Sequence, residues 1–460
     1  AVMMADKVPA MMNFTASHDA VRSAIDKASI THILTSRKFL SKIKMEPLPE
    51  MVFLEDIAAG VTRREKILMT LAAALLPHQE FMNILSPASH RDVMRTAVIL
   101  FSSGSTGIPK GVMLSHHNFN SDIHSFLKVM NWTDGDSVLG SLPLFHAFGL
   151  NTCFWLPLMI GCKVVYVTSP LDSEAVGKAV GKYQLTILLA TPTFMQNYMR
   201  KCKPEQFKSL RLAIAGAEKL RTDISAKFEY ISNGERVLIE GYGCTELSPI
   251  VAINIGSSVL DLGKQYGKKG SIGPAMPGIC ARIVDPVTRK PLPQDTEGLL
   301  VIKGPNVMQG YLGEPELTAE AVQDGWYNTG DIARIDGDGY ITLCGRLSRF
   351  SKIGGEMVPH ELVECAINEI IGTDEKVAAV SSIPDPQKGE ALIVLYTKLP
   401  VSPEKIIEEM RACKITNLWI PKAANFYRID AIPMLGSGKL DLVALRAEAD
   451  KIAAQVQKNS

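Results

Sequence analysis

Residues 101–111 have the sequence Phe101-Ser102-Ser103-Gly104-Ser105-Thr106-Gly107-Ile108-Pro109-Lys110-Gly111. The apolar run before it, Thr96 to Phe101, predicts a buried strand that leads into this stretch. Glycines let the backbone turn tightly and point several N–H groups at one anion, and the hydroxyls and Lys110 add donors and a positive charge. The stretch therefore predicts a polyphosphate-binding loop, with an ordinary Ser/Gly surface loop as the alternative. It is not a GxxxxGK[ST] P-loop, because no Ser or Thr follows Lys110.

The composition predicts a globular, soluble protein of two or three domains. The chain has 460 residues, of which 46% are hydrophobic and 21% charged, and a domain usually takes ~100–200 residues. Its 49 basic and 48 acidic residues give no basic excess of the kind that nucleic-acid binding needs. The eight cysteines form no CxxC pair, which argues against a zinc site or a disulfide framework and suits a reducing cytoplasm.

Strands followed by glycine-rich or polar turns recur along the chain and predict an α/β fold. Apolar strands are expected at residues 137–142, 163–167, 187–190, 210–215 and 236–240. Turns follow at residues 143–149, 216–218 and 241–246. Ligands of open α/β sheets bind at the carboxyl ends of the strands, so we expect these turns and the 102–111 loop to meet at one crevice.

From about Gly270 onward, short strands with Gly/Pro turns predict a β-rich subdomain. The fold expected is therefore a large multi-sheet N-terminal domain over 1–345 and a small, mobile α+β domain over 346–460. Local signals place helices from Ser115, which can cap the helix that follows it, and from Ser402, which precedes Pro403. Residues 67–76 predict a buried or interfacial helix that is too short to span a bilayer. No signal peptide is apparent.

Eight motifs along the chain resemble those of the adenylate-forming superfamily, which includes acyl-CoA synthetases, luciferases and peptide-synthetase adenylation domains. They stand in the superfamily's order: SSGSTGIPKG (102–111), PLFHAFG (143–149), AGAE (215–218), GYGCTE (241–246), GPNVMQGY (304–311), WYNTGD (326–331), GR…K…GGE (345–356) and P…GSGK (433–439). Within the superfamily, the stretches 7–15, 35–40, 215–220 and 435–439 most resemble the acyl-acyl carrier protein synthetase half of bifunctional 2-acylglycerophosphoethanolamine acyltransferase.

The resemblance implies a two-step ligase that needs ATP and Mg²⁺. A fatty acid carboxylate attacks the α-phosphorus of ATP to give an acyl-adenylate and pyrophosphate, and a thiol then displaces AMP. The implied thiol is the phosphopantetheine of acyl carrier protein, with CoA as the alternative acceptor. The implied location is the cytoplasm, with peripheral contact to the inner membrane as an option.

The resemblance also implies roles for individual residues. Lys439, Glu246, Thr245 and His146 would be catalytic, with Glu246 holding Mg²⁺ and His146 orienting the carboxylate. Tyr242 would stack on adenine. The residues implied to bind ATP or AMP are Ser102, Ser103, Gly104, Ser105, Thr106, Gly107, Lys110, Gly216, Ala217, Glu218, Gly241, Tyr242, Gly243, Thr245, Asp331, Arg346 and Lys439.

The hinge departs from the superfamily's pattern, because Ser348 stands where Asp or Lys is usual and Arg349 where an acid is common. We expect Ser348, Arg349, Lys352, Gly354 and Gly355 to form the hinge, and Arg349 to contact an acidic carrier protein. The resemblance also implies that about a hundred further residues of α/β structure would come before the point where this sequence begins. An exposed apolar margin is therefore expected around Val8–Phe14, with low solubility and weak activity.

The sequence is also compatible with three other functions: a fatty acyl-CoA synthetase, a luciferase-like oxidoreductase, and a protein that holds an acyl chain or AMP without catalysis. The acyl pocket is the least constrained part. Leu150, Cys153, Phe154 and Leu156 are the candidate wall residues.

Overall fold

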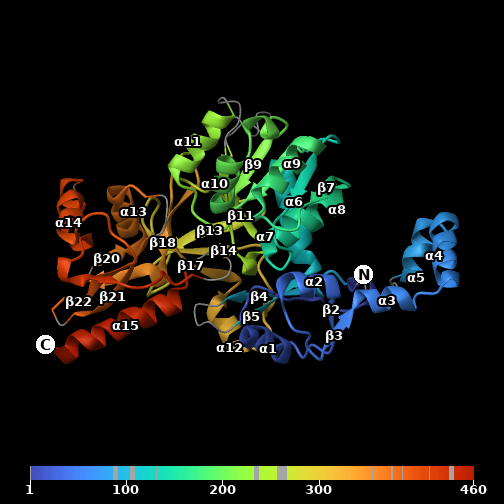
Figure 1. The fold of residues 1–460 in the computed structure, drawn as a ribbon, viewed down its shortest axis with the longest axis horizontal. Helices are drawn as coiled ribbons and strands as arrows, with labels where there is room; N and C mark the ends of the chain where they lie inside the picture. Colours follow the sequence, from blue (N-terminus) through green and yellow to red (C-terminus); the bar gives the residue numbers. More distant parts are fainter. Residues whose placement is uncertain are drawn as a thin grey trace.

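The computed structural model describes residues 2–85, 92–103, 109–130, 132–232, 238–255, 267–354, 356–373, 377–385, 387–413, 415–434 and 440–459. Figure 1 shows the chain running from an N-terminal region (blue), through a helix-covered sheet (green) and a β-rich part (yellow), to a C-terminal region (orange and red) at the opposite end. This order of regions confirms the predicted α/β class.

A six-stranded sheet with the order β11-β10-β9-β8-β6-β7 forms the centre of the large domain. All its neighbouring strands are parallel except β10 and β11. The strands are β6 (Ser137–Gly140), β7 (Lys163–Tyr166), β8 (Ile187–Ala190), β9 (Leu212–Ala215), β10 (Leu238–Gly243) and β11 (Ile250–Ile253). The first five match the strands that the apolar runs predicted.

Helices cover both faces of this sheet, as the apolar strands require. One face packs on α6 (His116–Val129) and the other on α9 (Ser173–Tyr183), α10 (Pro192–Lys201) and α11 (Thr222–Ile231). Ser115 caps α6 as predicted, since its hydroxyl accepts a hydrogen bond from the amide of Asn118. The short helices α7 (Ala147–Leu150), η3 (Asn151–Trp155) and α8 (Leu156–Ile160) follow β6, and η4 (Pro204–Phe207) follows α10.

The strands on either side of the predicted phosphate loop form a hairpin in a second sheet. This sheet has the order β1-β4-β5-β15, with β1 (Ala10–Met11), β4 (Thr96–Ser103), β5 (Pro109–Ser115) and β15 (Gly310–Tyr311). Strands β4 and β5 are antiparallel and pair as far as Ser103 with Pro109. The glycine-rich stretch therefore connects two hairpin strands, and it is not a crossover turn of the parallel sheet.

A third sheet confirms the β-rich subdomain. Its order is β12-β18-β17-β14-β13, with β16 added against β17. The strands are β12 (Gly273–Pro274), β13 (Cys280–Val284), β14 (Gly298–Lys303), β16 (Val322–Gln323), β17 (Trp326–Ile335) and β18 (Tyr340–Arg346), with α12 (Pro315–Ala321) before β16 and η5 (Thr245–Leu247) between β10 and β11.

The C-terminal region is an α+β unit with its own core. Its sheet has the order β20-β19-β22-β21, with β23 parallel to β22. The elements are η7 (Leu347–Arg349), β19 (Phe350–Ile353), β20 (Glu356–Pro359), α13 (His360–Ile371), β21 (Ala378–Asp385), β22 (Gly389–Tyr396), α14 (Pro403–Ala412), η8 (Asn417–Trp419), η9 (Ala423–Asn425), β23 (Phe426–Arg428) and α15 (Leu442–Asn459). Ser402 caps α14 as predicted.

The N-terminal region is built from short elements. They are η1 (Met3–Ala5), α1 (His18–Lys27), β2 (Ile33–Thr35), α2 (Arg37–Ile43), β3 (Met51–Phe53), α3 (Leu54–Gly60), α4 (Arg63–Leu75) and α5 (His78–Leu85). The strand expected around residues 8–14 is only β1, which pairs with β4. Val8 and Phe14 are exposed, as expected for this margin, whereas Ala10, Met11 and Met12 are half-buried.

The helix predicted at residues 67–76 is α4, but the prediction that it could be buried is wrong. None of its residues is buried, and Figure 1 shows α4 and α5 standing away from the rest of the chain. An apolar run carries no information about whether another element covers it. Among the described residues, no helix is both long and apolar enough to cross a membrane.

Candidate active site

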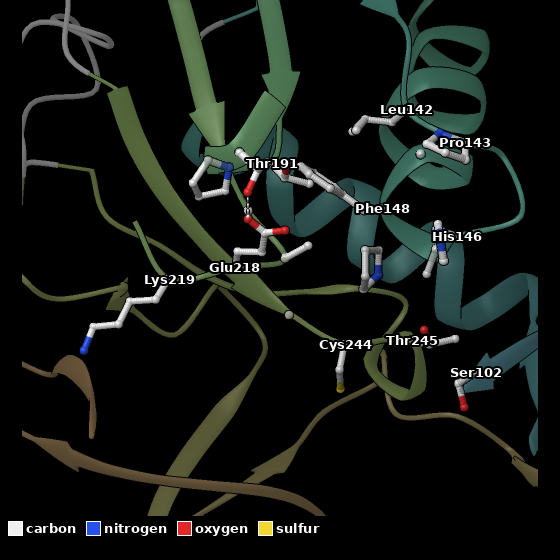
Figure 2. Close-up of a pocket in the computed structure, with 18 of the residues that line it drawn as sticks. Ser102, Leu142, Pro143, His146, Phe148, Thr191, Glu218, Lys219, Cys244 and Thr245 are labelled. Carbon is white, nitrogen blue, oxygen red and sulfur yellow. Dashed lines mark hydrogen bonds between the residues drawn. The ribbon is translucent and has the colours of Figure 1, made fainter. Parts of the chain in front are cut away.

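One cleft of about 2980 Å³ opens where the three sheets of the large domain face the C-terminal region. Its lining includes Ser102 and Lys110 of the hairpin and the turns 142–149, 216–220 and 241–246. The predicted convergence of these turns is therefore confirmed. Figure 2 shows Glu218, on the turn after β9, pointing toward Thr191, with Lys219 extending in another direction and His146 and Phe148 on the opposite side. Typical ligand pockets measure ~300–1,000 Å³, so this cleft has room for more than one reactant.

Asp331 lines the cleft and lies between two donors from different elements. Its side chain is 7% exposed, and its Oδ1 lies 2.8 Å from Nε of Arg346 on the neighbouring strand β18. The Tyr242 hydroxyl, at the end of β10, donates to Asp331 Oδ2. Burial, and then the charge of Asp331, raises the pKa of Tyr242 well above its ordinary value, so the hydroxyl stays a neutral donor. These two donors fix the orientation of the carboxylate.

Glu246 lies on η5, and Tyr311 connects it to the hairpin. The Tyr311 hydroxyl donates to Glu246 Oε1 over 3.1 Å, and Lys110 Nζ lies 5.2 Å from the centre of the Tyr311 ring. The backbone of Tyr311 pairs with Val112 of β5. Tyr311 is a site residue that we did not predict, although it ends the GPNVMQGY motif, and that position was the available signal.

The turn after β9 approaches β10 closely. A Cβ on Gly216 would lie 3.3 Å from the carbonyl oxygen of Gly241 and 3.3 Å from the Phe148 ring, so the loops would have to move apart for any larger residue. Ala217 has a φ of 70°, a left-handed conformation that costs about 1–3 kcal/mol for a residue other than glycine. Such strain is concentrated at functional sites. Glu218, which follows Ala217, is held by Thr193, whose Oγ1 donates to Glu218 Oε2 over 2.7 Å.

His146 lines the cleft just before α7. It is half-buried, its ring centre lies 4.5 Å from that of Phe145, and its amide donates to the carbonyl of Pro143. Ser102 and Thr245 also line the cleft. The positions of His146 and Thr245 agree with their implied roles, which remain predictions.

The predicted acyl-wall residues do not line the cleft. Leu150, Cys153 and Leu156 are buried in the main core, and Phe154 is exposed. Helix spacing alone does not distinguish an apolar face toward the core from one toward a pocket. The apolar walls come instead from segments before and after these residues, which include Met11, Phe14, Leu142, Phe145, Phe148, Val167, Leu171 and Phe194.

The prediction that Arg349 is available to a carrier protein is corrected by its burial. Arg349 is 3% exposed. Its Nη2 lies 2.6 Å from Oε1 of Glu364 on α13, and its Nη1 donates to the carbonyl of Val380 over 3.5 Å. A guanidinium held in this way organises the C-terminal region itself. Ser348 lines the cleft, whereas Lys352 and Gly354 are exposed and lie away from it.

Several predicted site residues fall outside the described part of the chain. These are Gly104, Ser105, Thr106, Gly107, Gly355 and Lys439, together with the side chain of Ser103. Their roles remain predictions.

A buried polar cluster beneath the Thr245–Glu246 turn was not predicted. Asn151 Nδ2 donates to Asp122 Oδ2 and, over 2.8 Å, to the carbonyl of Ser248. The amide of Ile250 donates to Asp122 Oδ1 over 3.1 Å. Burial raises the pKa of Asp122 well above its ordinary value. In the sequence, Asp122 resembles any polar residue of an amphipathic helix, so no local signal marks its role in positioning the turn.

Comparison with known proteins decides the family. Residues 1–312 match the AMP-binding enzyme family. The chain belongs to this family. The match confirms the predicted superfamily and, with it, the prediction of an AMP-forming acid–thiol ligase. It does not test the closer resemblance to the acyl-acyl carrier protein synthetase.

Two curated relatives and one solved structure are similar over most of the chain. A feruloyl-CoA synthase of Amycolatopsis sp is 32% identical over 349 residues, which are 75% of this chain and 68% of that protein. A long-chain-fatty-acid–CoA ligase of Yersinia pestis is 30% identical over 368 residues, 78% of this chain and 62% of that protein. ATP-bound MatB from Rhodopseudomonas palustris has the same fold, with a TM-score of 0.80 at 23% identity over 98% of this chain and 86% of that one.

Proposed function

We propose that this AMP-binding enzyme activates a fatty acid as an acyl-adenylate and transfers the acyl group to CoA. One observation supports this most: a single cleft brings the Asp331–Arg346–Tyr242 cluster, Glu246 and the hairpin with Lys110 next to apolar walls. A nucleotide needs partners for ribose and phosphate, and an alkyl chain needs apolar surface. The similarity to a long-chain-fatty-acid–CoA ligase supports the same substrate class.

In this proposal, Asp331 accepts hydrogen bonds from the ribose hydroxyls. A carboxylate has about four lone-pair positions, so it can accept these while Arg346 and Tyr242 hold it in place. Tyr242 presents its ring to adenine. His146 orients the substrate carboxylate, and the backbone and hydroxyls of residues 102–107 bind the β- and γ-phosphates, with Lys110 adding charge. Positioning and charge neutralisation then account for the rate of the first step.

The proposed Mg²⁺ ligand is Glu246. Among the described residues, no group of three His, Cys, Asp or Glu side chains is arranged to hold a metal. This fits Mg²⁺, which is commonly held by one or two carboxylates together with substrate phosphates and water. Tyr311 donates to one carboxylate oxygen of Glu246 and so orients the group. Bound Mg²⁺ would neutralise phosphate charge while pyrophosphate leaves.

The thiol that accepts the acyl group is either CoA or acyl carrier protein, and the proposal has one form for each. CoA is favoured because the feruloyl-CoA synthase and the long-chain-fatty-acid–CoA ligase that resemble this chain are both named for CoA. The contact expected between Arg349 and a carrier protein is also not available, because Arg349 is buried. Acyl carrier protein remains the second candidate because of the stretches 7–15, 35–40, 215–220 and 435–439. Thioester formation should be measured with CoA and with holo-acyl carrier protein across a series of fatty acids. A higher kcat/KM with the carrier protein would overturn the CoA proposal, and absence of pyrophosphate release with every acid would overturn both.

We also propose that residue 346 begins a mobile C-terminal domain and that Lys439 serves adenylation only. The domain would turn between the two steps, so that different faces meet the cleft. Lys439→Ala should abolish acyl-adenylate formation but still convert pre-made acyl-adenylate to thioester. Equal loss of both half-reactions would contradict this division. Cytoplasmic location with peripheral membrane contact is part of the same proposal.

A further inference from the structure

Helices α4 and α5 expose apolar side chains that no described part of the chain covers. None of their described residues is buried, and Leu68 and Leu75 are 65% and 75% exposed. Figure 1 shows the two helices projecting from the molecule beyond α3. A contiguous exposed apolar patch usually marks an interaction surface.

Four of the exposed apolar side chains of α4 form one stripe. At ~100° per residue, the four side chains lie within an arc of about 100°. They are Ile67, Leu68, Leu71 and Leu75. The helix has local stabilisation that does not depend on burial, because a capping box satisfies donors at its first turn. The Glu65 amide donates to Thr62 Oγ1 over 3.2 Å, and the Thr62 amide donates to Glu65 Oε2 over 2.7 Å. The stripe is therefore displayed on a locally stabilised helix.

Positive charges stand at the start of this stripe. Arg63, Arg64 and Lys66 are exposed, and none of them takes part in the ion pairs given for the described residues. The one acidic residue among them, Glu65, is held by Thr62 in the cap. Cations beside an apolar stripe are the surface chemistry of helices that lie in a membrane interface.

We propose that α4 and α5 dock on the surface of an anionic phospholipid bilayer. The Leu and Ile side chains of the stripe enter the boundary between headgroups and acyl chains. Arg63 and Arg64, which lie beside or within the arc of the stripe, contact headgroup phosphates. The charge of the first turn selects an anionic lipid surface over a neutral one. This proposal is independent of the activity proposed above, because it depends only on this surface.

The test is co-flotation of the whole chain with vesicles, using phosphatidylcholine alone and phosphatidylcholine mixed with phosphatidylglycerol. Three proteins are compared with the parent. Leu68→Gln/Leu75→Gln removes apolar contact, and Arg63→Gln/Arg64→Gln removes charge. Val287→Gln/Lys290→Gln is the matched control, because Val287 is 88% exposed in a turn after β13 and Lys290 is also exposed. Circular dichroism melts and pyrophosphate release verify that every variant is folded.

The parent and the control should float with anionic vesicles and bind neutral vesicles weakly. The leucine variant should bind at least about tenfold more weakly at any salt concentration. The charge variant should lose about fivefold per cation at low salt, and the difference should shrink as salt rises. A parent that does not bind, or folded variants that bind like the parent, would overturn the proposal. Loss of self-association in the leucine variant, without any vesicle binding by the parent, would assign the surface to a second copy.

Discussion

Gly243→Ala should disable the active site by forcing two strands apart. A Cβ at this position would lie 1.8 Å from the carbonyl oxygen of Pro249 and 2.7 Å from its carbon. Both are backbone atoms, so no side chain can rotate away. Real Cβ contacts below 3.0 Å are essentially absent, and the backbone must therefore move by at least about 1.2 Å, as overpacking of this kind demands.

The displaced segment carries Thr245 and Glu246, which stand two and three residues after Gly243. A misplacement of ~1 Å costs about 100-fold in rate, so pyrophosphate release at saturating ATP and fatty acid should fall by about that factor. Gly135→Ala is the control, because its Cβ would meet only Thr133 Oγ1, at 4.0 Å. It should retain most of the activity. If the Gly243 variant kept activity within a few-fold of the parent, with an unchanged melting temperature, the argument from backbone contact would be refuted.

Three further predictions concern buried polar groups. Burial raises the pKa of Glu240 from 4.5 to about 7, so the free energy of unfolding should fall as the pH rises from about 4.5 to 7. Urea unfolding of Glu240→Gln should show no such fall. If the free energy of unfolding of this variant depended on pH as it does in the parent, Glu240 would not be the cause. Arg349→Met should destabilise the chain by about 3–5 kcal/mol in thermal unfolding, because the buried Glu364 carboxylate loses its cationic partner and keeps only the Val380 amide. Arg349→Met/Glu364→Leu should recover most of this stability, and equal melting of all three proteins would contradict the pairing. Tyr242→Phe should raise the KM for ATP about tenfold, because Asp331 loses a donor while the aromatic face remains, and an unaltered KM would rule out this role.

The strands of the central sheet could be predicted because their signals are local. Runs such as 187–190 and 212–215 are apolar throughout and end in distinctive turns, and both are wholly buried strands. Ser115 and Ser402 marked helix starts for the same reason, since a cap is made within four residues. Convergence of the turns followed from the carboxyl-end rule of α/β sheets.

The errors arose where long-range packing decides the outcome. Arg349 resembled a free hinge cation in the sequence, and only the position of α13 brings Glu364 within 2.6 Å of it. Cys153 and Leu156 have the apolar character of pocket walls, but their helices turn them into the core. The α4 helix contains an apolar run of the kind found in core helices, yet none of its described residues is buried. In each case the sequence showed the type of the residue, but its burial depends on elements that are distant in the chain.

The pairing of β15 with β5 has a consequence for synthesis on the ribosome. Tyr311 pairs with Val112, and the two strands are separated by about 200 residues. At ~5–20 residues per second, β15 emerges roughly 10–40 s after β5. During that interval the hairpin that carries the glycine-rich loop has an unpaired edge, which is open to wrong partners. Glu246 also emerges before Tyr311, the residue whose hydroxyl orients its carboxylate. The nascent chain therefore completes the nucleotide site only after most of its length has been made.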